Sequence, residues 1–186
     1  MIEIEAKVKV ESHEPVRERL RALGATYIGK VLESNHIFDK PKGTLRNKGR
    51  GLRVRSCEVL DGNGPGSTMT FKGPRQPGGL KKRVEEETTV EDPAAARVIL
   101  KHLGFKEIAF FQKRRETWRL GDCTIELDEV PHLGCFVEIE GPGESEIETR
   151  RTELCLDQTD VVSSSYIKLL VEHCERHQLS AKSISF

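Results

Sequence analysis

The sequence lacks the features that mark membrane-spanning, secreted or nucleic-acid-binding proteins. Lys plus Arg and Asp plus Glu number 30 each, so the formal net charge is zero. Without a basic excess we expect no general nucleic-acid binding. No apolar run approaches the roughly 20 residues of a membrane-spanning helix. Because the first predicted strand starts at residue 2, we expect no signal peptide before it. We therefore expect no membrane partner.

Cysteine is scarce, and its spacing is uninformative for metal binding. The five cysteines lie at positions 57, 123, 135, 155 and 174 and contain no Cys-x-x-Cys pair. An odd, scattered set argues against a disulfide framework or a zinc site and is typical of reduced thiols. Aromatic residues make up only 5% of the 186 residues, but the chain is long enough for one domain with a core. We expect a cytoplasmic protein.

What the sequence does contain is a strict alternation of apolar and charged residues over positions 2–10. Ile2, Ile4, Ala6, Val8 and Val10 fall on one face, and Glu3, Glu5, Lys7 and Lys9 fall on the other. A period of two predicts a β-strand with two unlike faces. For a single strand, a solvated polar face would be the ordinary interpretation. The same pattern, however, returns in most of the other predicted strands.

Further extended segments are predicted at residues 27–39, 52–57, 68–72, 83–89, 109–120, 123–130 and 135–141. The spacing of apolar residues predicts helices at 14–24, 93–104, 146–156 and 164–177. The first two of these also have a proline near the start and a glycine at the end. Residues 41–51, 61–66 and 73–79 are rich in glycine, proline or basic residues and are predicted to be loops or turns.

An internal repeat indicates how these segments are organised. At an offset of 80 residues, eight positions that span a strand, a helix and the start of the next strand are identical. Identities of common residues also arise by chance, but these fall on equivalent elements. We therefore expect one domain over residues 1–178, with related halves at about 1–80 and 81–178. Residues 179–186 are expected to form a flexible tail.

The charged strand faces carry both signs in similar number. The carboxylates are Glu3, Glu5, Glu85, Glu87, Glu126, Asp128, Glu138 and Glu140, and the cations are Lys7, Lys9, Arg53, Arg55, Lys72, Arg83, Lys113 and Arg115. Because the helices have apolar stripes to cover, the apolar strand faces are their natural partners. The charged faces then line the inside of a closed antiparallel β-barrel, and the fold class is α+β.

Such a lumen indicates a charged ligand, since burying ion pairs for stability alone breaks even at best. Oxygen ligands favour Mg²⁺ or Mn²⁺, and Mg²⁺ is commonly shared between carboxylates and substrate phosphates. Arginine side chains bind phosphate oxygens bidentately, and lysine adds compact positive charge. A divalent metal together with many cations predicts a polyphosphate ligand.

A set of short motifs follows in order along nearly the whole chain. They are Glu3-Ile4-Glu5-Ala6-Lys7, Leu52-Arg53-Val54-Arg55, Thr70-Phe71-Lys72-Gly73-Pro74, Arg83-x-Glu85-x-Glu87, Lys113-x-Arg115, Leu127-Asp128-Glu129-Val130, Leu133-Gly134-x-Phe136-Val137-Glu138-Ile139-Glu140, and Ser165-Tyr166 before Leu169-Leu170. Together they resemble the CYTH superfamily, the triphosphate tunnel metalloenzymes. The resemblance implies an eight-stranded antiparallel tunnel with helices packed outside.

The resemblance also implies roles for individual residues. Glu3, Glu5, Asp128, Glu138 and Glu140 would hold Mg²⁺ or Mn²⁺, and Lys7, Arg53, Arg55, Lys72, Arg83, Lys113 and Arg115 would bind the triphosphate. The residues expected to be catalytic are Glu3, Glu5, Lys7 and Asp128. Glu85, Glu87 and Glu126 rank below these as metal ligands or as residues that orient the cations.

The motif spacing looks most similar to the class IV adenylyl cyclase branch, which converts ATP to cyclic AMP and pyrophosphate. The alternatives are hydrolysis of inorganic triphosphate, thiamine triphosphate or a nucleoside triphosphate, and a non-catalytic polyphosphate or nucleotide-binding module. One departure is Asn35-His36-Ile37, where the superfamily often has Asp-x-Tyr. We expect nucleoside contacts from residues 41–51 or 74–79, or from Asn35 and His36. The choice of metal and the formation of a homodimer stay open.

Overall fold

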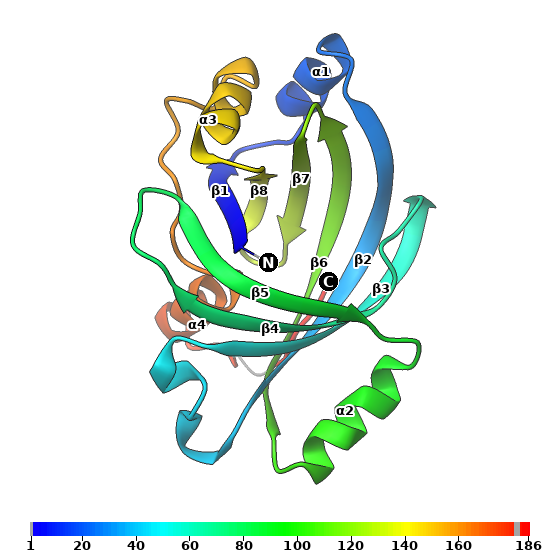
Figure 1. Ribbon diagram of the computed structural model, residues 1–186, viewed down its shortest axis with the longest axis vertical. Coiled ribbons are helices and arrows are strands. Elements are labelled where there is room, and N and C mark those ends of the chain that lie inside the picture. The colour runs from blue at the N-terminus through cyan, green and yellow to red at the C-terminus, as the bar shows by residue number, and fades with distance from the viewer. Residues whose placement is uncertain (1, 181–182) are drawn as a thin grey trace.

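The computed structural model describes residues 2–180 and 183–186. Eight antiparallel strands form a closed barrel, in the order β2-β3-β4-β5-β1-β8-β7-β6 with β6 pairing back onto β2 (Figure 1). The strands are β1 (Ile2–Val10), β2 (Thr26–Asp39), β3 (Gly51–Gly62), β4 (Thr68–Arg75), β5 (Lys81–Thr89), β6 (Lys106–Leu120), β7 (Cys123–Val130) and β8 (Gly134–Glu140). The predicted α+β barrel is confirmed.

The barrel is closed by its two longest strands, β2 and β6. They pair from Thr26↔Arg119 to Asp39↔Lys106, with register shifts near both ends. Each strand follows a helix that itself follows a strand, β1-α1-β2 in one case and β5-α2-β6 in the other. The structure thus places the same succession of elements over both segments of the sequence repeat. A common origin for the two halves stays a prediction.

The helices are α1 (Glu14–Ala22), α2 (Pro93–His102), α3 (Glu144–Glu153) and α4 (Tyr166–Arg176), with short 3₁₀ turns at Pro41–Gly43 and Arg46–Lys48. Two of them begin at side-chain caps, because Asp92 accepts from the backbone N–H groups of Ala94 and Ala95, and Ser165 accepts from that of Lys168. Among the described residues, no helix is long and apolar enough to cross a membrane.

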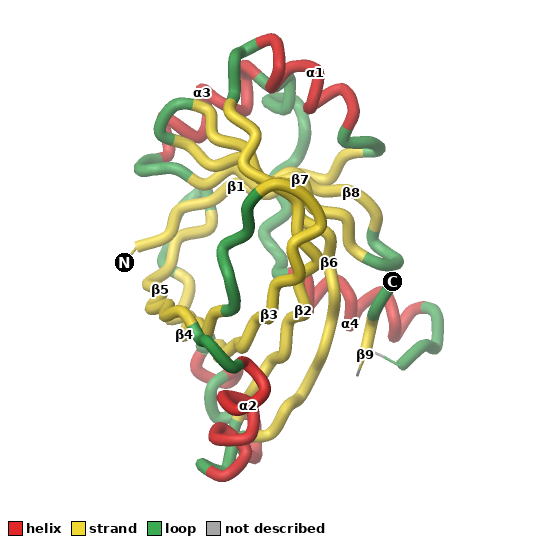
Figure 2. Tube along the Cα trace, turned by 90° about the vertical axis from the view of Figure 1, so that its right-hand side faces the viewer, coloured by secondary structure: helices red, strands yellow, loops and turns green. Residues whose placement is uncertain are grey.

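Helices α1 and α3 cover the apolar outer faces of β1, β8 and β7 at one end of the molecule (Figures 1 and 2). Val16 and Leu20 of α1 and Ile147 of α3 belong to one buried cluster with Ala6 and Val8 of β1. At the opposite end, a smaller cluster joins α2 to the outer faces of β2 and β3 (Figure 2). This packing follows from the alternation, since the apolar positions that face outward leave the charged positions facing inward.

Helix α4 packs differently, against residues on the inward face of the barrel. Phe136 shares its strand face with Glu138, and Phe111 shares its face with Lys113, yet both phenylalanines are buried in a cluster with Tyr166 and other residues of α4. The lumen therefore changes from charged to apolar where α4 closes it, and Tyr166 enters the lumen from outside the sheet.

The C-terminal residues 179–186, predicted to be a flexible tail, include a short strand β9 (Ser183–Ile184). It runs parallel to β6 beside Phe110 and Phe111, and the side chain of Ile184 is buried. The described part of this segment therefore packs on the barrel, and flexibility of the segment in solution stays a prediction.

Candidate active site in a charged tunnel

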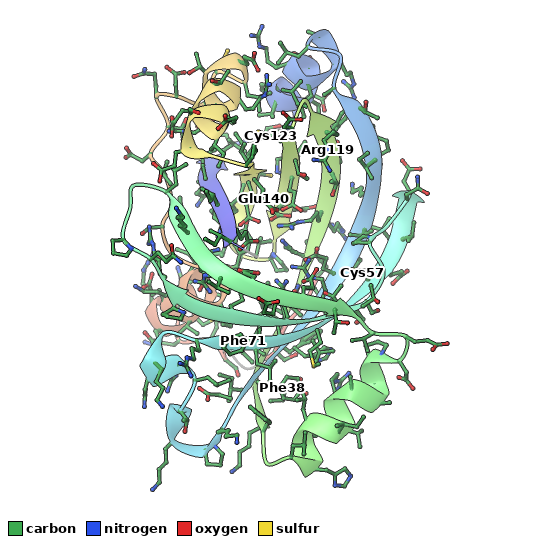
Figure 3. The ribbon with its side chains drawn as sticks, in the orientation of Figure 1. Phe38, Cys57, Phe71, Arg119, Cys123 and Glu140 are labelled. Carbon is green, nitrogen blue, oxygen red and sulfur yellow. The ribbon has the colours of Figure 1, made fainter. Side chains whose placement is uncertain are left out.

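The barrel encloses a cavity of about 770 Å³, a volume within the usual range for small-molecule sites. Figure 3 shows side chains that converge on the barrel interior, where Glu140 is labelled. The charged residues that line the cavity are Glu3, Glu5, Glu33, Glu85, Glu86, Glu87, Glu126, Glu138 and Glu140, with Lys7, Arg53, Arg55, Lys72, Lys81, Arg83, Lys113 and Arg115. Every residue predicted to bind metal or triphosphate is in this set except Asp128, whereas Lys9, which was expected on the lumen face, is exposed and is not part of the lining.

Arg115 lies at the centre of the charged network. Its guanidinium donates two hydrogen bonds to Asp128, Nε to Oδ1 at 2.7 Å and Nη2 to Oδ2 at 2.6 Å. It also pairs with Glu126 and Glu138. Burial alone would lower the pKa of Arg115, but Asp128, Glu126 and Glu33 raise it well above its usual value. Arg115 is therefore held as a fixed cation.

Asp128 lies behind the cations and has no exposed surface. In addition to Arg115, it accepts hydrogen bonds from the Lys113 ammonium at 2.9 Å and from the Tyr166 hydroxyl at 2.8 Å. Its oxygens are therefore engaged by groups that themselves line the cavity. This arrangement suits a residue that orients two cations, whereas its predicted roles as a metal ligand and catalytic group stay predictions.

Glu33 was not identified from the sequence, although it organises the same cations from the other side. It is fully buried, and its carboxylate lies 2.9 Å from Arg55, 3.4 Å from Lys113 and 3.8 Å from Arg115. Burial alone would raise the pKa of Glu33, but these three cations hold it well below the usual range. Glu33 lies two residues before Asn35 in the predicted strand 27–39, so the alternation places both side chains on the same face of the strand. This spacing could have identified Glu33 as a lumen residue.

Two more residues of the cavity lining, Lys81 and Tyr166, were not among the predicted site residues. Lys81 lies two residues before Arg83 on β5, so extending the predicted strand 83–89 by two residues would have placed it on the lumen face. Its ammonium lies 2.5 Å from Glu5. Tyr166 could be found only through its motif, because α4 is not part of the sheet. Its ring lies under two ammonium groups, with the Lys7 Nζ 3.9 Å and the Lys113 Nζ 5.2 Å from the ring centroid.

A second group of cations lies on β3 and β4. Burial and the neighbouring Arg53 lower the pKa of Lys72 to about 8, and burial and Arg55 lower that of Arg53 to about 10. The Lys72 ammonium contacts Glu85 at 2.5 Å and lies 3.8 Å from Glu3. Mutual repulsion among these cations would be relieved by an anionic ligand.

Carboxylates are concentrated on the wall formed by β1, β8 and β7. Glu5 lies directly opposite Glu140, and Glu126 lies directly opposite Glu138, an arrangement that is unfavourable for like charges. Within the last pair, burial raises the pKa of Glu126 to about 8, whereas Lys7, Lys113 and Arg115 hold that of Glu138 well below its usual value despite its burial. The pair therefore carries less than two negative charges near neutral pH.

The residues of this wall fit a divalent cation. Burial, with contributions from neighbouring carboxylates, raises the pKa of both Glu3 and Glu140. The buried Oε2 of Glu3 has no hydrogen-bond partner. All the donors are carboxylate oxygens, the ligands that Mg²⁺ and Mn²⁺ prefer. Among the described residues, no three His, Cys, Asp or Glu side chains are already grouped closely enough to hold a metal.

The predicted nucleoside contacts are only partly supported. Asn35 lines the cavity and accepts a hydrogen bond from Arg55, but His36 points away from the cavity toward Glu107, at 2.9 Å. No residue of segments 41–51 or 74–79 is part of the cavity lining. The prediction was wrong for these loops, because nothing in a loop's composition tells where along the tunnel axis it lies.

An uncharged part of the lining comes instead from the start of β2 and from the turn after β3. It consists of Ile28, Gly29, Val31, Asn63, Gly64 and Pro65. The turn is fixed by a backbone hydrogen bond from Asn63 to Ile28. A Cβ on Gly29 would lie 2.1 Å from the Asn63 carbonyl oxygen, so only glycine permits this close approach.

The model of the CYTH domain matches residues 1–170 of the chain. The chain belongs to the CYTH family. CYTH proteins act on triphosphate substrates such as ATP and generally depend on divalent metals. The charged tunnel described above has the composition that this chemistry requires.

The chain is also similar to individual proteins and solved structures. A protein of Methanocaldococcus jannaschii that is named as a candidate adenylate cyclase is 36% identical over 140 residues, which is 75% of this chain and 77% of its own. The solved structure of a Pyrococcus horikoshii protein is 29% identical, with a TM-score of 0.74, and the match covers 90% of this chain and 98% of that one.

A candidate adenylyl cyclase from Hippeastrum, which is described as having a dominant triphosphatase activity, has a TM-score of 0.68 at 17% identity. The match covers 96% of this chain and 97% of that one. At this identity the likeness shows the CYTH fold alone.

Proposed function

We propose that this protein is a metal-dependent enzyme that binds a triphosphate in its tunnel and converts ATP to cyclic AMP and pyrophosphate. The observation that carries the proposal is the cavity lining, in which many cations share the lumen with a wall of directly opposed carboxylates. The relation to the Methanocaldococcus protein favours the cyclase over other reactions of triphosphates.

In this proposal the cations of the lining bind and orient the triphosphate. Arg53, Arg55, Arg115 and Arg83 supply planar donors, and Lys7, Lys72 and Lys113 supply point charges. Glu3, Glu5, Glu138 and Glu140 would hold Mg²⁺ or Mn²⁺. When bound, the metal would neutralise charge that develops on the phosphate oxygens. Asp128, the remaining predicted ligand, holds Lys113 and Arg115 in position.

Cyclisation further requires that the ribose 3′-oxygen lies in line with the α-phosphorus, so the nucleoside must be held as well. The uncharged part of the lining is suited to this task. Ile28, Val31 and Pro65 offer apolar contacts, and the Asn63 side chain can hydrogen-bond a base or a ribose hydroxyl. We assign the nucleoside to this stretch, since the 41–51 and 74–79 loops do not reach the cavity.

The second candidate is a triphosphatase, in which water attacks the terminal phosphorus. It is favoured by the short uncharged stretch, since charged residues dominate the lining and hold phosphates better than they hold a nucleoside. A non-catalytic polyphosphate-binding module has less support, because an anion binder does not need the carboxylate wall.

The test is to incubate the purified protein with Mg²⁺ or Mn²⁺ and, separately, ATP, inorganic triphosphate or thiamine triphosphate, and to identify the products. Cyclic AMP and pyrophosphate from ATP support the cyclase. Rapid release of orthophosphate without cyclic AMP assigns the protein to the triphosphatases, and binding without turnover assigns it to the non-catalytic modules.

A pair of variants tests where the nucleoside lies. Asn63→Ala is expected to raise the KM for ATP with little effect on inorganic triphosphate. Asn47→Ala is the matched control, because its side chain donates a hydrogen bond to the Lys42 carbonyl of its own loop and is not part of the cavity lining. Equal effects of Asn63→Ala on both substrates would contradict the assignment.

A further inference from the structure

Lys81 occupies an unusual place in the tunnel. It lies on β5 directly across from Glu5 on β1, and both side chains are nearly buried, with 12% and 9% of their surface exposed. The Lys81 ammonium donates a hydrogen bond to Glu5 Oε1 at 2.5 Å. Glu5, one of the proposed metal ligands, is therefore already bound by a cation of the protein, as Glu138 is by Lys7 and Arg115.

The local charge explains why a cation is needed at this position. Glu5 lies opposite Glu140 on the neighbouring strand, and Glu3 lies two residues away on the same face of β1. Of the ion pairs that the described residues form, Lys81 supplies the one that involves Glu5. Without Lys81, three carboxylates would share this part of the lumen with no cation bound to Glu5.

We propose that Lys81 is a built-in counter-ion that occupies Glu5 in the metal-free tunnel and moves to the triphosphate when a divalent cation binds Glu5. The inference rests on the proposed function, namely that metal and triphosphate bind in this lumen. Glu5 Oε1 cannot be shared at hydrogen-bond distance by an ammonium and a metal without strong repulsion. The long, flexible stem of lysine allows the displaced ammonium to move within the cavity that it lines.

Two consequences follow for binding. Metal on its own binds weakly, because it must displace the Lys81 ammonium. Metal and triphosphate bind cooperatively, because the triphosphate stabilises the ammonium that the metal displaces, and such coupling is reciprocal. Lys81 would thereby couple occupation of the metal site to the presence of substrate.

The experiment compares Lys81→Met with Lys82→Met. Lys82 is the matched control, because it lies on the opposite face of the same strand and is not part of the cavity lining. The free Mn²⁺ signal is followed by electron paramagnetic resonance as protein without triphosphate is titrated. Binding of inorganic triphosphate is measured separately by calorimetry, once in EDTA and once at saturating Mn²⁺.

Lys81→Met is expected to bind Mn²⁺ about tenfold more tightly than the unmodified protein, the size expected for removing one charge-assisted hydrogen bond from the ligand. At saturating Mn²⁺, when the Lys81 ammonium has left Glu5 for the ligand, Lys81→Met is also expected to bind inorganic triphosphate about tenfold more weakly than the unmodified protein. In EDTA, where Lys81 stays on Glu5, the two proteins should bind inorganic triphosphate alike. Lys82→Met should match the unmodified protein in both assays. Lys81→Arg, which keeps the charge, should restore weak Mn²⁺ binding.

Unchanged or weaker Mn²⁺ binding by Lys81→Met overturns the inference and leaves the proposed function standing. An unmodified protein that binds neither Mn²⁺ nor inorganic triphosphate overturns the proposed function and the inference with it. A thermal melt establishes that each variant is folded. If Lys81→Met is not folded, Lys81→Gln, which removes the charge but keeps a donor for Glu5, is judged by the same two measurements.

Discussion

Replacing Asp128 with Asn tests the charge network most directly, because the substitution keeps the size of the side chain and removes one buried negative charge. Asp128 is fully buried and accepts hydrogen bonds from Arg115, Lys113 and Tyr166. In the variant, an amide group that is itself a donor would face two cations. We expect a large loss of stability in the absence of ligand.

The magnitude follows from the contacts. Breaking a buried ion pair by removing one partner costs about 3–5 kcal/mol. Because Glu138 and Glu126 also pair with Arg115, we expect the lower part of that range, about 3 kcal/mol. For a domain of this size each kcal/mol lowers Tm by roughly 2–4 °C, so a decrease of roughly 6–12 °C is expected.

The assay is thermal unfolding followed by circular dichroism at pH 7 without metal, with urea unfolding as a second measure. Glu129→Gln is the matched control, since Glu129 pairs at 3.3 Å with Arg114 and both side chains are partly exposed. Such surface pairs contribute about 0–1 kcal/mol. If Asp128→Asn melts within about 2 °C of the unmodified protein, the cation-orienting role is refuted. Loss of Mn²⁺ affinity with unchanged stability would instead support the predicted metal-ligand role.

Three further predictions concern the lumen. Arg53→Ala should weaken binding of inorganic triphosphate about tenfold or more, because a charge-assisted contact is lost. Arg50 is not part of the cavity lining, so Arg50→Ala should leave this binding unchanged. Calorimetry measures both variants. Because burial and Glu85 raise the pKa of Glu3, Glu3→Gln should keep or raise Tm while weakening Mn²⁺ binding, and a lower Tm would contradict this. Burial raises the pKa of Glu126 from 4.5 to about 8, so the folded state binds its proton more tightly and stability falls as pH rises between these values. Stability is measured by urea unfolding at pH 6 and at pH 8. Between these two pH values, Glu126→Gln should lose less stability than the unmodified protein, and equal losses would refute the raised pKa of Glu126.

The sequence by itself predicted the barrel and nearly all of its lumen residues. Side chains alternate across a strand with a period of two, so the face on which Glu3 or Arg53 lies is a local property of its own segment. The helices between the strands needed apolar partners, and this fixed which face had to point inward. The offset of 80 residues further anticipated that β1-α1-β2 and β5-α2-β6 are equivalent successions.

The position of a residue along the tunnel and its depth in the wall were not predictable in this way. Asp128 and Glu126 share a strand face, yet only Glu126 lines the cavity. The 41–51 loop has the basic composition of a ligand-binding loop but lies away from the lumen. Such differences depend on the register of neighbouring strands and on the helices and loops that pack against them. Neither can be read from the sequence of a single strand.

Only the tertiary structure decided which charges meet. Lys81 pairs with Glu5 across 76 positions of the sequence, and Tyr166 reaches Asp128 across 38. Glu33 joins cations from β3 and β6 because β2 lies between these two strands in the closed barrel. The physical reason is that pairing across a barrel requires strand order, register and closure to be satisfied together. These are properties of the whole sheet, whereas alternation is a property of each strand alone.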